Sequence, residues 1–293
     1  MRVVLLGPNG QLGSDIRRAH AMAQEGIDLV PLGRERLDVT ASRAIETTLG
    51  AEEFDALINC TSYHRTDEAE DNADLAIAVN AHAVQGIAKF CASKGARFLH
   101  VSTDYVFGGD ATRTLPLCET DPIAPLNVYG ASKALGETLA RLACADTLIL
   151  RVASLFGVDG ASGKGGNFVE TMIRAGYERG ALRVVDDQIM SPTATTDVAS
   201  AILALLRQCA APGIYHVVNS GQASWFDFAS EIIRLAGVPA TVTRCTSADY
   251  PTRAMRPRYS SLDTGKLSDI LGQPLPPWQE ALQRYLRAKG HVG

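Results

Sequence analysis

Near its N-terminus the chain reads Val3-Val4-Leu5-Leu6-Gly7-Pro8-Asn9-Gly10-Gln11-Leu12-Gly13. The apolar residues form a run of the length expected for a buried strand, and a helix-like segment begins at Ser14. The glycines have the spacing G-x-x-G-x-x-G, in which missing side chains let the backbone turn sharply and approach a diphosphate, whose charge then meets the helix N-terminus. The stretch therefore predicts a dinucleotide-binding strand, turn and helix, with an ordinary tight turn as the alternative.

Beyond this stretch, short apolar runs alternate with longer helical patterns, which favours a parallel sheet with helices on both faces. The predicted strands of this half are residues 2–6, 28–32, 56–59, 97–102 and 147–152, and the clearest helices are residues 74–94 and 128–144. The C-terminal half is more mixed, with predicted helices at 167–179, 196–208 and 225–236 and a strand at 214–218. The pattern predicts an α/β protein with a doubly wound parallel sheet.

A tyrosine and a lysine, Tyr129 and Lys133, lie four residues apart in the predicted helix 128–144, so both side chains would project from one face. Leu135, Leu139 and Leu142 give this helix an apolar stripe. A phenol normally loses its proton near pH ~10, and a neighbouring ammonium would bring that pKa closer to neutrality. The pair therefore predicts a general acid, although the same spacing also occurs by chance.

Composition restricts the class of protein. The chain has 293 residues, of which 46% are hydrophobic and 20% are charged, with a formal net charge of −4. These values are typical of a globular protein, and the lack of a Lys/Arg cluster argues against nucleic-acid binding. The six cysteines form no C-x-x-C pair and have no histidine at zinc-ligand spacing, which predicts reduced thiols and no metal site. No segment looks like a signal peptide or approaches a membrane span, so we expect no membrane contact and a cytoplasmic location.

The order of these motifs resembles the extended short-chain dehydrogenase/reductase superfamily and, within it, the dTDP-4-dehydrorhamnose reductase family. The resemblance covers nearly the whole chain. It rests on Gly10-Gln11-Leu12-Gly13, Asp67-x-Ala69-Glu70, Val79-Asn80-Ala81, Ser102-Thr103-Asp104-Tyr105-Val106-Phe107, Pro125-Leu126-Asn127-Val128-Tyr129-Gly130-x-Ser132-Lys133, Gly166-Asn167-Phe168, Asp187-Gln188, Pro192-Thr193 and Arg256-Pro257-x-x-Ser260-x-Leu262. In sugar-nucleotide dehydratases of the superfamily the threonine is typically followed by Asp-Glu, whereas Asp104-Tyr105 follows here, which favours reduction without dehydration.

The resemblance implies a Rossmann dinucleotide-binding domain at residues 1–153, to which segments near 190–220 return. It also implies a smaller C-terminal α/β substrate-binding portion at residues 154–293, interleaved with the first. The implied reaction is the NAD(P)H-dependent reduction of the C4 keto group of dTDP-4-dehydro-L-rhamnose. Tyr129 would protonate the developing alkoxide, Thr103 would position the carbonyl oxygen, and Lys133 would favour the phenolate and bond the nicotinamide ribose.

Cofactor contacts are expected along the first half of the chain. The glycine turn and the resemblance together predict Gly7, Gly10, Gln11, Leu12, Gly13, Arg34, Asp38, Val39, Cys60, Thr61, Ser102, Tyr129 and Lys133. In folds that prefer NAD, a carboxylate follows the second strand, but here Leu32 is followed by Gly33-Arg34. A guanidinium can pair with a 2′-phosphate, so Arg34 favours NADPH; NADH stays open, because Arg34 is equally consistent with a solvated loop charge.

The predicted substrate-binding residues are Thr103, Asp104, Asn167 and Arg256. By resemblance, Asn167 and Arg256 would bind the diphosphate of a nucleotide-sugar. Trp225 and Trp278 are interpreted as packing residues. The chain departs from the family where Ala153-Ser154 replaces a Ser-Trp pair and where Ile189-Met190-Ser191 follows Gln188. Some family members bind magnesium at a dimer contact through glutamates; here Asp15 could replace one, but Thr196 stands at another, so a homodimer and a magnesium ion are both left open.

Two alternatives remain on sequence grounds. The chain could be another nucleotide-sugar 4-reductase or a 4-epimerase of the same superfamily. It could also be a non-catalytic regulatory subunit that binds a dinucleotide, because a subunit of that kind resembles this family. The intact set of Thr103, Tyr129 and Lys133 favours an enzyme.

Overall fold

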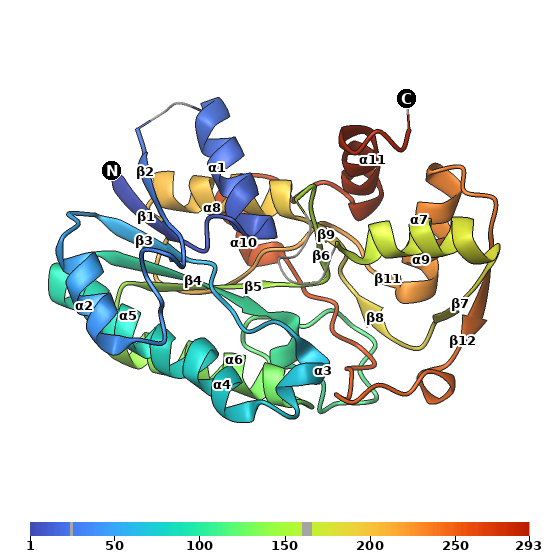
Figure 1. Ribbon diagram of the computed structural model, residues 1–293, viewed down its shortest axis with the longest axis horizontal. Coiled ribbons are helices and arrows are strands. Elements are labelled where there is room, and N and C mark those ends of the chain that lie inside the picture. Colours follow the sequence, from blue (N-terminus) through green and yellow to red (C-terminus); the bar gives the residue numbers. More distant parts are fainter. Residues whose placement is uncertain (24–25, 160–165, 293) are drawn as a thin grey trace.

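The computed structural model describes residues 1–23, 26–159 and 166–292 (Figure 1). The strands are β1 (Arg2–Leu6), β2 (Asp28–Leu32), β3 (Ala56–Asn59), β4 (Arg97–Thr103), β5 (Thr147–Val152), β6 (Leu155–Phe156), β7 (Ala181–Val185), β8 (Ile189–Met190), β9 (Thr193–Ala194), β10 (Gly213–His216), β11 (Ala223–Ser224) and β12 (Thr241–Cys245). The helices are α1 (Gln11–Ala23), α2 (Ser42–Gly50), α3 (Thr66–Ala69), α4 (Ala73–Ile77), η1 (Ala78–His82), α5 (Ala83–Lys94), η2 (Asp104–Val106), α6 (Val128–Ala143), α7 (Phe168–Arg179), α8 (Thr195–Arg207), α9 (Trp225–Leu235), η3 (Ser247–Asp249), α10 (Gly265–Leu271) and α11 (Trp278–Ala288).

A six-stranded sheet forms the centre of the molecule, in the order β10-β5-β4-β3-β1-β2. All neighbouring strands in it are parallel. From β1 the chain moves outward to β2 and then returns to the other side of β1 to form β3, β4 and β5. The order therefore reverses between β1 and β3, which is where doubly wound folds open a crevice beyond the carboxyl ends of the strands. The predicted fold class is confirmed.

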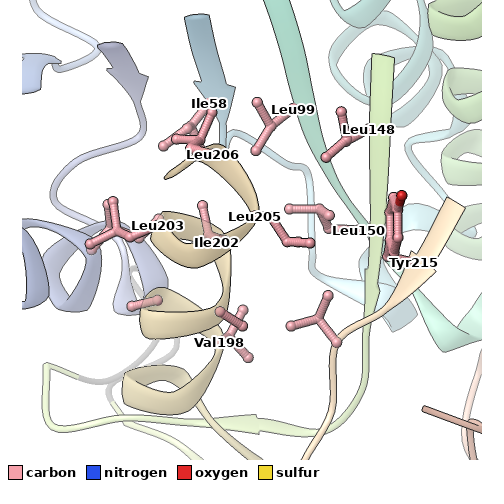
Figure 2. Close-up of a cluster of buried hydrophobic side chains, with 14 of the residues drawn as sticks. Ile58, Leu99, Leu148, Leu150, Val198, Ile202, Leu203, Leu205, Leu206 and Tyr215 are labelled. Atoms are coloured by element: carbon pink, nitrogen blue, oxygen red, sulfur yellow. The ribbon is translucent and has the colours of Figure 1, made fainter. Parts of the chain in front are cut away.

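Helices cover both faces of the sheet, which explains why its strands are almost continuously apolar. Side chains alternate along β1, so Val3 and Leu5 join the core under α1 and α8, whereas Val4 and Leu6 join the core under α2 and α5. Figure 2 shows the first of these cores, where Leu205 and Leu206 of α8 approach the sheet. The glycine turn after β1 is thus fixed between two buried layers.

A second core holds the C-terminal part of the chain together. It lies among α7, α9 and α11, beside the parallel pair β7 and β12 (Figure 1). Strand β10 and helix α8 belong to the central sheet and its cover, although they lie in the second half of the sequence. The division into two domains at residue 153 stays a prediction.

Helix α6 exists where the sequence predicts it, but its apolar stripe is not its buried face. Leu135 and Leu142, two of the three leucines in the expected stripe, are 40% and 79% exposed. The buried face instead contains small residues together with Lys133 and Glu137. The reason is close helix packing: a Cβ on Gly136 would lie 2.1 Å from the carbonyl oxygen of Asn80 in η1.

The expectation that no segment approaches a membrane span also needs correction. Ala73–Lys94, which comprises α4, η1 and α5, has 22 residues and is apolar enough to cross a membrane by length and composition. In this structure Val84, Ile87 and Cys91 of α5 pack into the core against β3 and β4. A core helix passes the same test of length and composition, so the segment gives only weak support for a membrane span. The cytoplasmic location stays a prediction.

Candidate active site

A cleft of about 980 Å³ lies beyond the carboxyl ends of β1, β3 and β4. Its walls include residues 6–13, 60–66 and 101–105, together with Tyr129 and Lys133 of α6. At the far side it reaches Phe168 and Trp225, the first residues of α7 and α9. The cleft therefore extends from the glycine turn to the C-terminal part of the chain.

The geometry of the glycine turn leaves room for a diphosphate. Gly7 has φ 76°, a conformation that side-chain-bearing residues rarely adopt, and the Gly10 amide donates to its carbonyl oxygen at 3.2 Å. A Cβ on Gly13 would lie 2.1 Å from the same carbonyl, so α1 can begin this close to the turn only with glycine there. Gly7, Gly10, Gln11, Leu12 and Gly13 all line the cleft. The first turn of α1 thus faces the cleft, as a dinucleotide site requires.

The wall formed by residues 32–40 contains Arg34, Asp38 and Val39. The Arg34 side chain is 87% exposed, and its guanidinium lies 3.5 Å from Asp38 Oδ2. Hydrogen bonds from the hydroxyl and amide of Thr40 hold the pKa of Asp38 below its usual value. Arg34 is thus exposed at the cleft and only loosely paired, so it can turn toward an anion.

Cys60 and Thr61 follow β3 and line the cleft next to the glycine turn, where a Cβ on Gly7 would lie 3.2 Å from the Cys60 backbone. The amide and hydroxyl of Thr61 both donate to Asn59 Oδ1, at 3.0 and 2.6 Å, which fixes this loop. Burial raises the pKa of the Cys60 thiol to about 12, so this cysteine stays protonated and inert. In the part of the chain that the structure describes, all six cysteines are free.

Thr103, Tyr129 and Lys133 come together in this cleft. Thr103 ends β4, whereas Tyr129 and Lys133 lie in the first two turns of α6. Two side chains cap that helix: Asn127 Oδ1 accepts from the Gly130 amide at 2.7 Å, and Glu70 Oε1 accepts from the Val128 amide at 2.9 Å. These caps fix where α6 begins and therefore where the phenol and the ammonium lie.

The pKa of Tyr129 is raised to about 12. Burial is the largest cause, and the negative charge of Asp104 adds to it, while hydrogen bonding to Thr103 and Ser62 acts in the opposite direction. The expectation that Lys133 brings this pKa down was wrong. Lys133 Nζ instead donates to the Val101 carbonyl at 2.6 Å and lies 3.1 Å from His100 Nε2. A raised pKa keeps the phenol protonated, as a proton donor must be.

Burial lowers the pKa of Lys133 to about 8, although the nearby Glu137 carboxylate raises it. The pKa of His100 is held well below its usual value by burial and by the charge of Lys133. His100 is therefore neutral at physiological pH, and its buried ring is held between Lys133 and Asn59. With its pKa only slightly above neutral pH, the Lys133 side chain is mostly protonated there and loses its charge as the pH rises through about 8.

Asp104 is buried beside Thr103. Its Oδ1 accepts from Thr103 Oγ1 at 3.1 Å and its Oδ2 accepts from Ser260 Oγ at 2.6 Å. Burial raises the pKa of this carboxyl to about 6, against the effect of those two hydrogen bonds. Ser260 belongs to the late Arg-Pro motif, so Asp104 links that motif to the catalytic threonine predicted from the sequence.

Asn167 and Arg256, the two residues predicted to bind the diphosphate, do not belong to the cleft as the described residues form it. Asn167 caps α7, and its amide donates to the Gly157 carbonyl at 3.0 Å and the Tyr285 hydroxyl at 3.1 Å. The Arg256 guanidinium donates twice to Asp67, at 2.7 and 2.6 Å. Both groups are already engaged within the protein, and their substrate contacts stay predictions.

The sequence interpretation missed several residues of the cleft. Trp225 was interpreted as a packing residue, but it lines the cleft and lies 4.6 Å from Phe168, measured between ring centroids. Trp278, in contrast, is 5% exposed and packs in the core as expected. Phe168 and Trp225 each begin a helix directly after a capping residue, Asn167 and Ser224, and this local pattern is visible in the sequence.

The arrangement around Asp15 bears on metal binding. Asp15 accepts a hydrogen bond from Thr195 and pairs with Arg18 at 2.6 Å, whereas Thr196 is exposed. Within residues 1–23, 26–159 and 166–292 no group of three or more His, Cys, Asp or Glu residues is arranged to hold a metal ion. The carboxylate of Asp15 is thus already neutralised by a guanidinium.

The glycine turn at the reversal of strand order, with a Tyr-x-x-x-Lys helix beside it, defines a Rossmann-type α/β protein of the short-chain dehydrogenase/reductase class. The model of one family, described as RmlD substrate binding domain, matches residues 1–290. The chain belongs to this family.

Curated relatives and a solved structure agree with this membership. The chain is 35% identical over 288 residues to the spore coat polysaccharide biosynthesis protein SpsK of Bacillus subtilis, covering 98% of both chains. It is 34% identical to the dTDP-4-dehydrorhamnose reductase of Escherichia coli, covering 98% of this chain and 97% of the relative. The crystal structure of dTDP-4-dehydrorhamnose reductase from Bacillus anthracis, in complex with NADP, aligns with a TM-score of 0.90 at 34% identity, covering 98% and 99% of the two chains.

Proposed function

We propose that this protein is an NAD(P)H-dependent oxidoreductase that reduces the C4 keto group of dTDP-4-dehydro-L-rhamnose to give dTDP-L-rhamnose. The observation that supports it most directly is the meeting of Thr103, Tyr129 and Lys133 in one cleft with the glycine turn. Relatives at 34% to 38% identity along nearly the whole chain are named for this reaction. The family and the site therefore point to the same chemistry.

NADPH bound along the glycine turn would supply the hydride. Tyr129 would donate its proton to the oxygen of the keto group, because burial keeps the phenol protonated. Thr103, whose hydroxyl lies between Tyr129 and Asp104, would hold that oxygen in place. Lys133 would bind the ribose next to the nicotinamide and so orient the cofactor beside Tyr129.

Arg34 supports NADPH as the preferred cofactor. Its guanidinium lies at the cleft, largely exposed, beyond the end of β2, where a 2′-phosphate would need a cation. The relative from Bacillus anthracis was solved in complex with NADP. NADH remains the second candidate, because the paired Asp38 could accept from ribose hydroxyls after Arg34 moves away.

The substrate is a nucleotide-sugar. Among the residues of the cleft that would contact its sugar are those in which this chain differs from many rhamnose-pathway reductases. Ala153 and Ser154 stand where many rhamnose-pathway reductases carry an indole, and Ser154 has φ 43°, a strained conformation at the edge of the cleft. Trp225 supplies an indole to the same cleft from α9. This difference favours a related 4-keto nucleotide-sugar as the second candidate substrate.

The decisive experiment measures oxidation of NADPH and NADH against a panel of 4-keto nucleotide-sugars, with product analysis. We expect stoichiometric NADPH oxidation and a 4-hydroxy product, fastest with dTDP-4-dehydro-L-rhamnose. Turnover without net consumption of NADPH would identify a 4-epimerase instead. Binding of NADPH with no oxidation by any substrate would favour the regulatory subunit and contradict the proposal.

A further inference from the structure

A fully buried ion pair lies directly behind the proposed catalytic residues. Glu137 of α6 and Arg151 of β5 are 3% and 2% exposed. Glu137 Oε1 accepts from Arg151 Nε at 3.0 Å, and Oε2 accepts from Arg151 Nη2 at 2.7 Å. Because Tyr129, Lys133 and Glu137 recur every four residues, the pair continues the face of α6 that carries the phenol and the ammonium.

Glu137 also holds the strand that ends in Thr103. The Ser102 hydroxyl donates to Glu137 Oε1 at 2.5 Å, and Ser102 lies opposite Arg151 in the parallel register of β4 and β5. One carboxylate therefore joins α6, β4 and β5 next to Thr103. This role explains why Ser102, predicted to bind the cofactor, has its hydroxyl engaged inside the protein.

The Arg151 guanidinium is balanced by Glu137 alone among its charged contacts in the described residues. Its Nη1 lies 3.4 Å from His216 Nε2, and its Cζ lies 4.8 Å from the centre of the Phe107 ring. Burial and the charge of Arg151 lower the pKa of His216 to about 3, so His216 stays neutral and acts as an acceptor. Without Glu137, Arg151 would be an uncompensated buried cation.

Lys133 is the second cation near this carboxylate. The groups that face it are Glu137 from α6, His100 and the Val101 carbonyl from β4, and Cys60, which directly follows β3. Of these, His100 is neutral and Cys60 is protonated. Glu137 is therefore the group that supplies negative charge to Lys133, and Arg151 of β5 competes for it.

We propose that Glu137 is a positioning residue for the reduction: it fixes α6 against the ends of β4 and β5, and it balances the charge of Arg151 beside the Lys133 ammonium. The inference rests on the proposed function for its kinetic consequence. The fixing of α6 and the charge balance around Arg151 and Lys133 can be tested in the protein without turnover.

The test compares two substitutions that should act in opposite directions. Glu137→Gln keeps the shape but removes the anion, so the titration midpoint of Lys133, followed by NMR of labelled lysine side chains and assigned with Lys133→Met, should fall by about one unit or more. Arg151→Met removes the competing cation, so that midpoint should rise. Combining both substitutions removes one negative and one positive charge, so the midpoint should return toward the wild-type value.

The kinetic arm follows kcat and KM for NADPH oxidation as pH changes. In Glu137→Gln we expect kcat at neutral pH to fall about tenfold with little change in NADPH affinity, and the basic limb of the profile to move to lower pH. Asp146→Asn is the matched control: Asp146 pairs with Arg97 at 3.0 Å at the opposite ends of the same strands, so this variant should keep the wild-type profile.

Two results would overturn the inference. One is a titration midpoint of Lys133 that does not change in Glu137→Gln. The other is a double variant in which Arg151→Met fails to return that midpoint toward the wild-type value. If Glu137→Gln does not fold, Arg151→Met and the double variant still give the sign of the effect. Absence of turnover in the wild-type protein would instead count against the proposed function. The titration of Lys133 would still test the role of Glu137, because it does not require turnover.

Discussion

Tyr129 and Asp104 share a buried corner of the cleft, and burial makes both side chains hold their protons more tightly. For the phenol this means that nearly every molecule carries the proton to be donated. For the carboxyl it means that ionisation falls close to physiological pH. Thr103 lies between them and hydrogen-bonds to Asp104, so the state of one group affects the other.

Replacing Tyr129 by phenylalanine tests the proposed proton donor. Tyr129→Phe removes the hydroxyl and leaves the ring that packs edge-on against Tyr105 with the ring centroids 6.0 Å apart. We expect turnover to fall by about a hundredfold or more, with NADPH affinity nearly unchanged, because a positioned general acid contributes on that order. Steady-state kinetics and a binding titration measure the two effects. Tyr177→Phe, at a position 63% exposed on α7, is the control, and wild-type turnover in Tyr129→Phe would refute the assignment.

Asp104 gives a stability prediction that depends on pH. Its native pKa of about 6 lies above the ordinary 3.8, so the native state binds the proton more tightly than the unfolded chain. The resulting stabilisation is fully present below pH ~4 and is lost as the pH rises through ~6. Asp104→Asn lacks this ionisation. Its stability relative to the wild-type protein should therefore rise by up to about 3 kcal/mol between pH ~4 and ~7.

Urea unfolding at a series of pH values tests this prediction for Asp104. The difference between the two proteins is the quantity of interest, because the other carboxyls titrate alike in both. A difference that stays constant across this range would show that Asp104 ionises normally in the folded protein.

At the level of the elements, α6 shows how a helix can be predicted correctly while its buried face is not. Its period of apolar residues predicted the helix, but Leu135 and Leu142 of that apolar stripe are exposed. The helix instead presents glycine and alanine to its neighbours, because η1 approaches so closely that Gly136 meets the Asn80 carbonyl. Close approach brings the polar face of α6, with Lys133 and Glu137, onto the sheet.

Gly136→Ala should therefore destabilise the protein. The added Cβ would lie 2.1 Å from backbone, so α6 or η1 must move, at a cost of about 1–3 kcal/mol in the free energy of unfolding. Because α6 carries Tyr129 and Lys133, we also expect turnover to fall. Gly50→Ala at the end of α2 is the matched control: no atom lies within 4 Å of its Cβ, so a neutral effect or a gain of about 0.4–1 kcal/mol is expected. Equal stability of the two variants would contradict the proposed close contact.

At the level of the whole molecule, segments distant in sequence complete the site. Strand β10 extends the sheet beside β5, and α8 covers the face that α1 also covers (Figure 1). Ser260 reaches Asp104, and Arg256 reaches Asp67, across more than half of the sequence. The C-terminal half therefore contributes a strand, a covering helix and hydrogen bonds to the sheet and the cleft.

Leu205→Ala tests this dependence. Leu205 is fully buried between α8 and the sheet, as Figure 2 shows, so its truncation should lower the free energy of unfolding by about 2–5 kcal/mol. Leu142→Ala, at a position 79% exposed, should change it by less than about 0.5 kcal/mol. The comparison uses urea unfolding with NADPH binding as a second probe. A small effect of Leu205→Ala would mean that α8 does not contribute to the main core.

Much of the fold could be predicted from local patterns. The five strands predicted for the first half match β1 to β5 within one residue, because strands covered on both faces read as short apolar runs. The glycine turn could be predicted because only glycine tolerates its backbone. The trio of Thr103, Tyr129 and Lys133 could be anticipated because Thr103 ends β4 and the Tyr-x-x-x-Lys motif begins α6, the next long helix along the chain.

The order of residues along this chain was enough to predict the strands of the parallel sheet, the glycine turn and the proposed catalytic groups, since each leaves a local signature: an apolar run, a glycine spacing or a Tyr-x-x-x-Lys motif. The protonation states of Tyr129, Lys133 and Asp104, the engagement of Asn167 and Arg256 elsewhere, and the support of the site by Glu137 and Arg151 emerged only after folding. The reason is physical: burial and charge at a point depend on every element packed around it, and those elements come from all parts of the sequence.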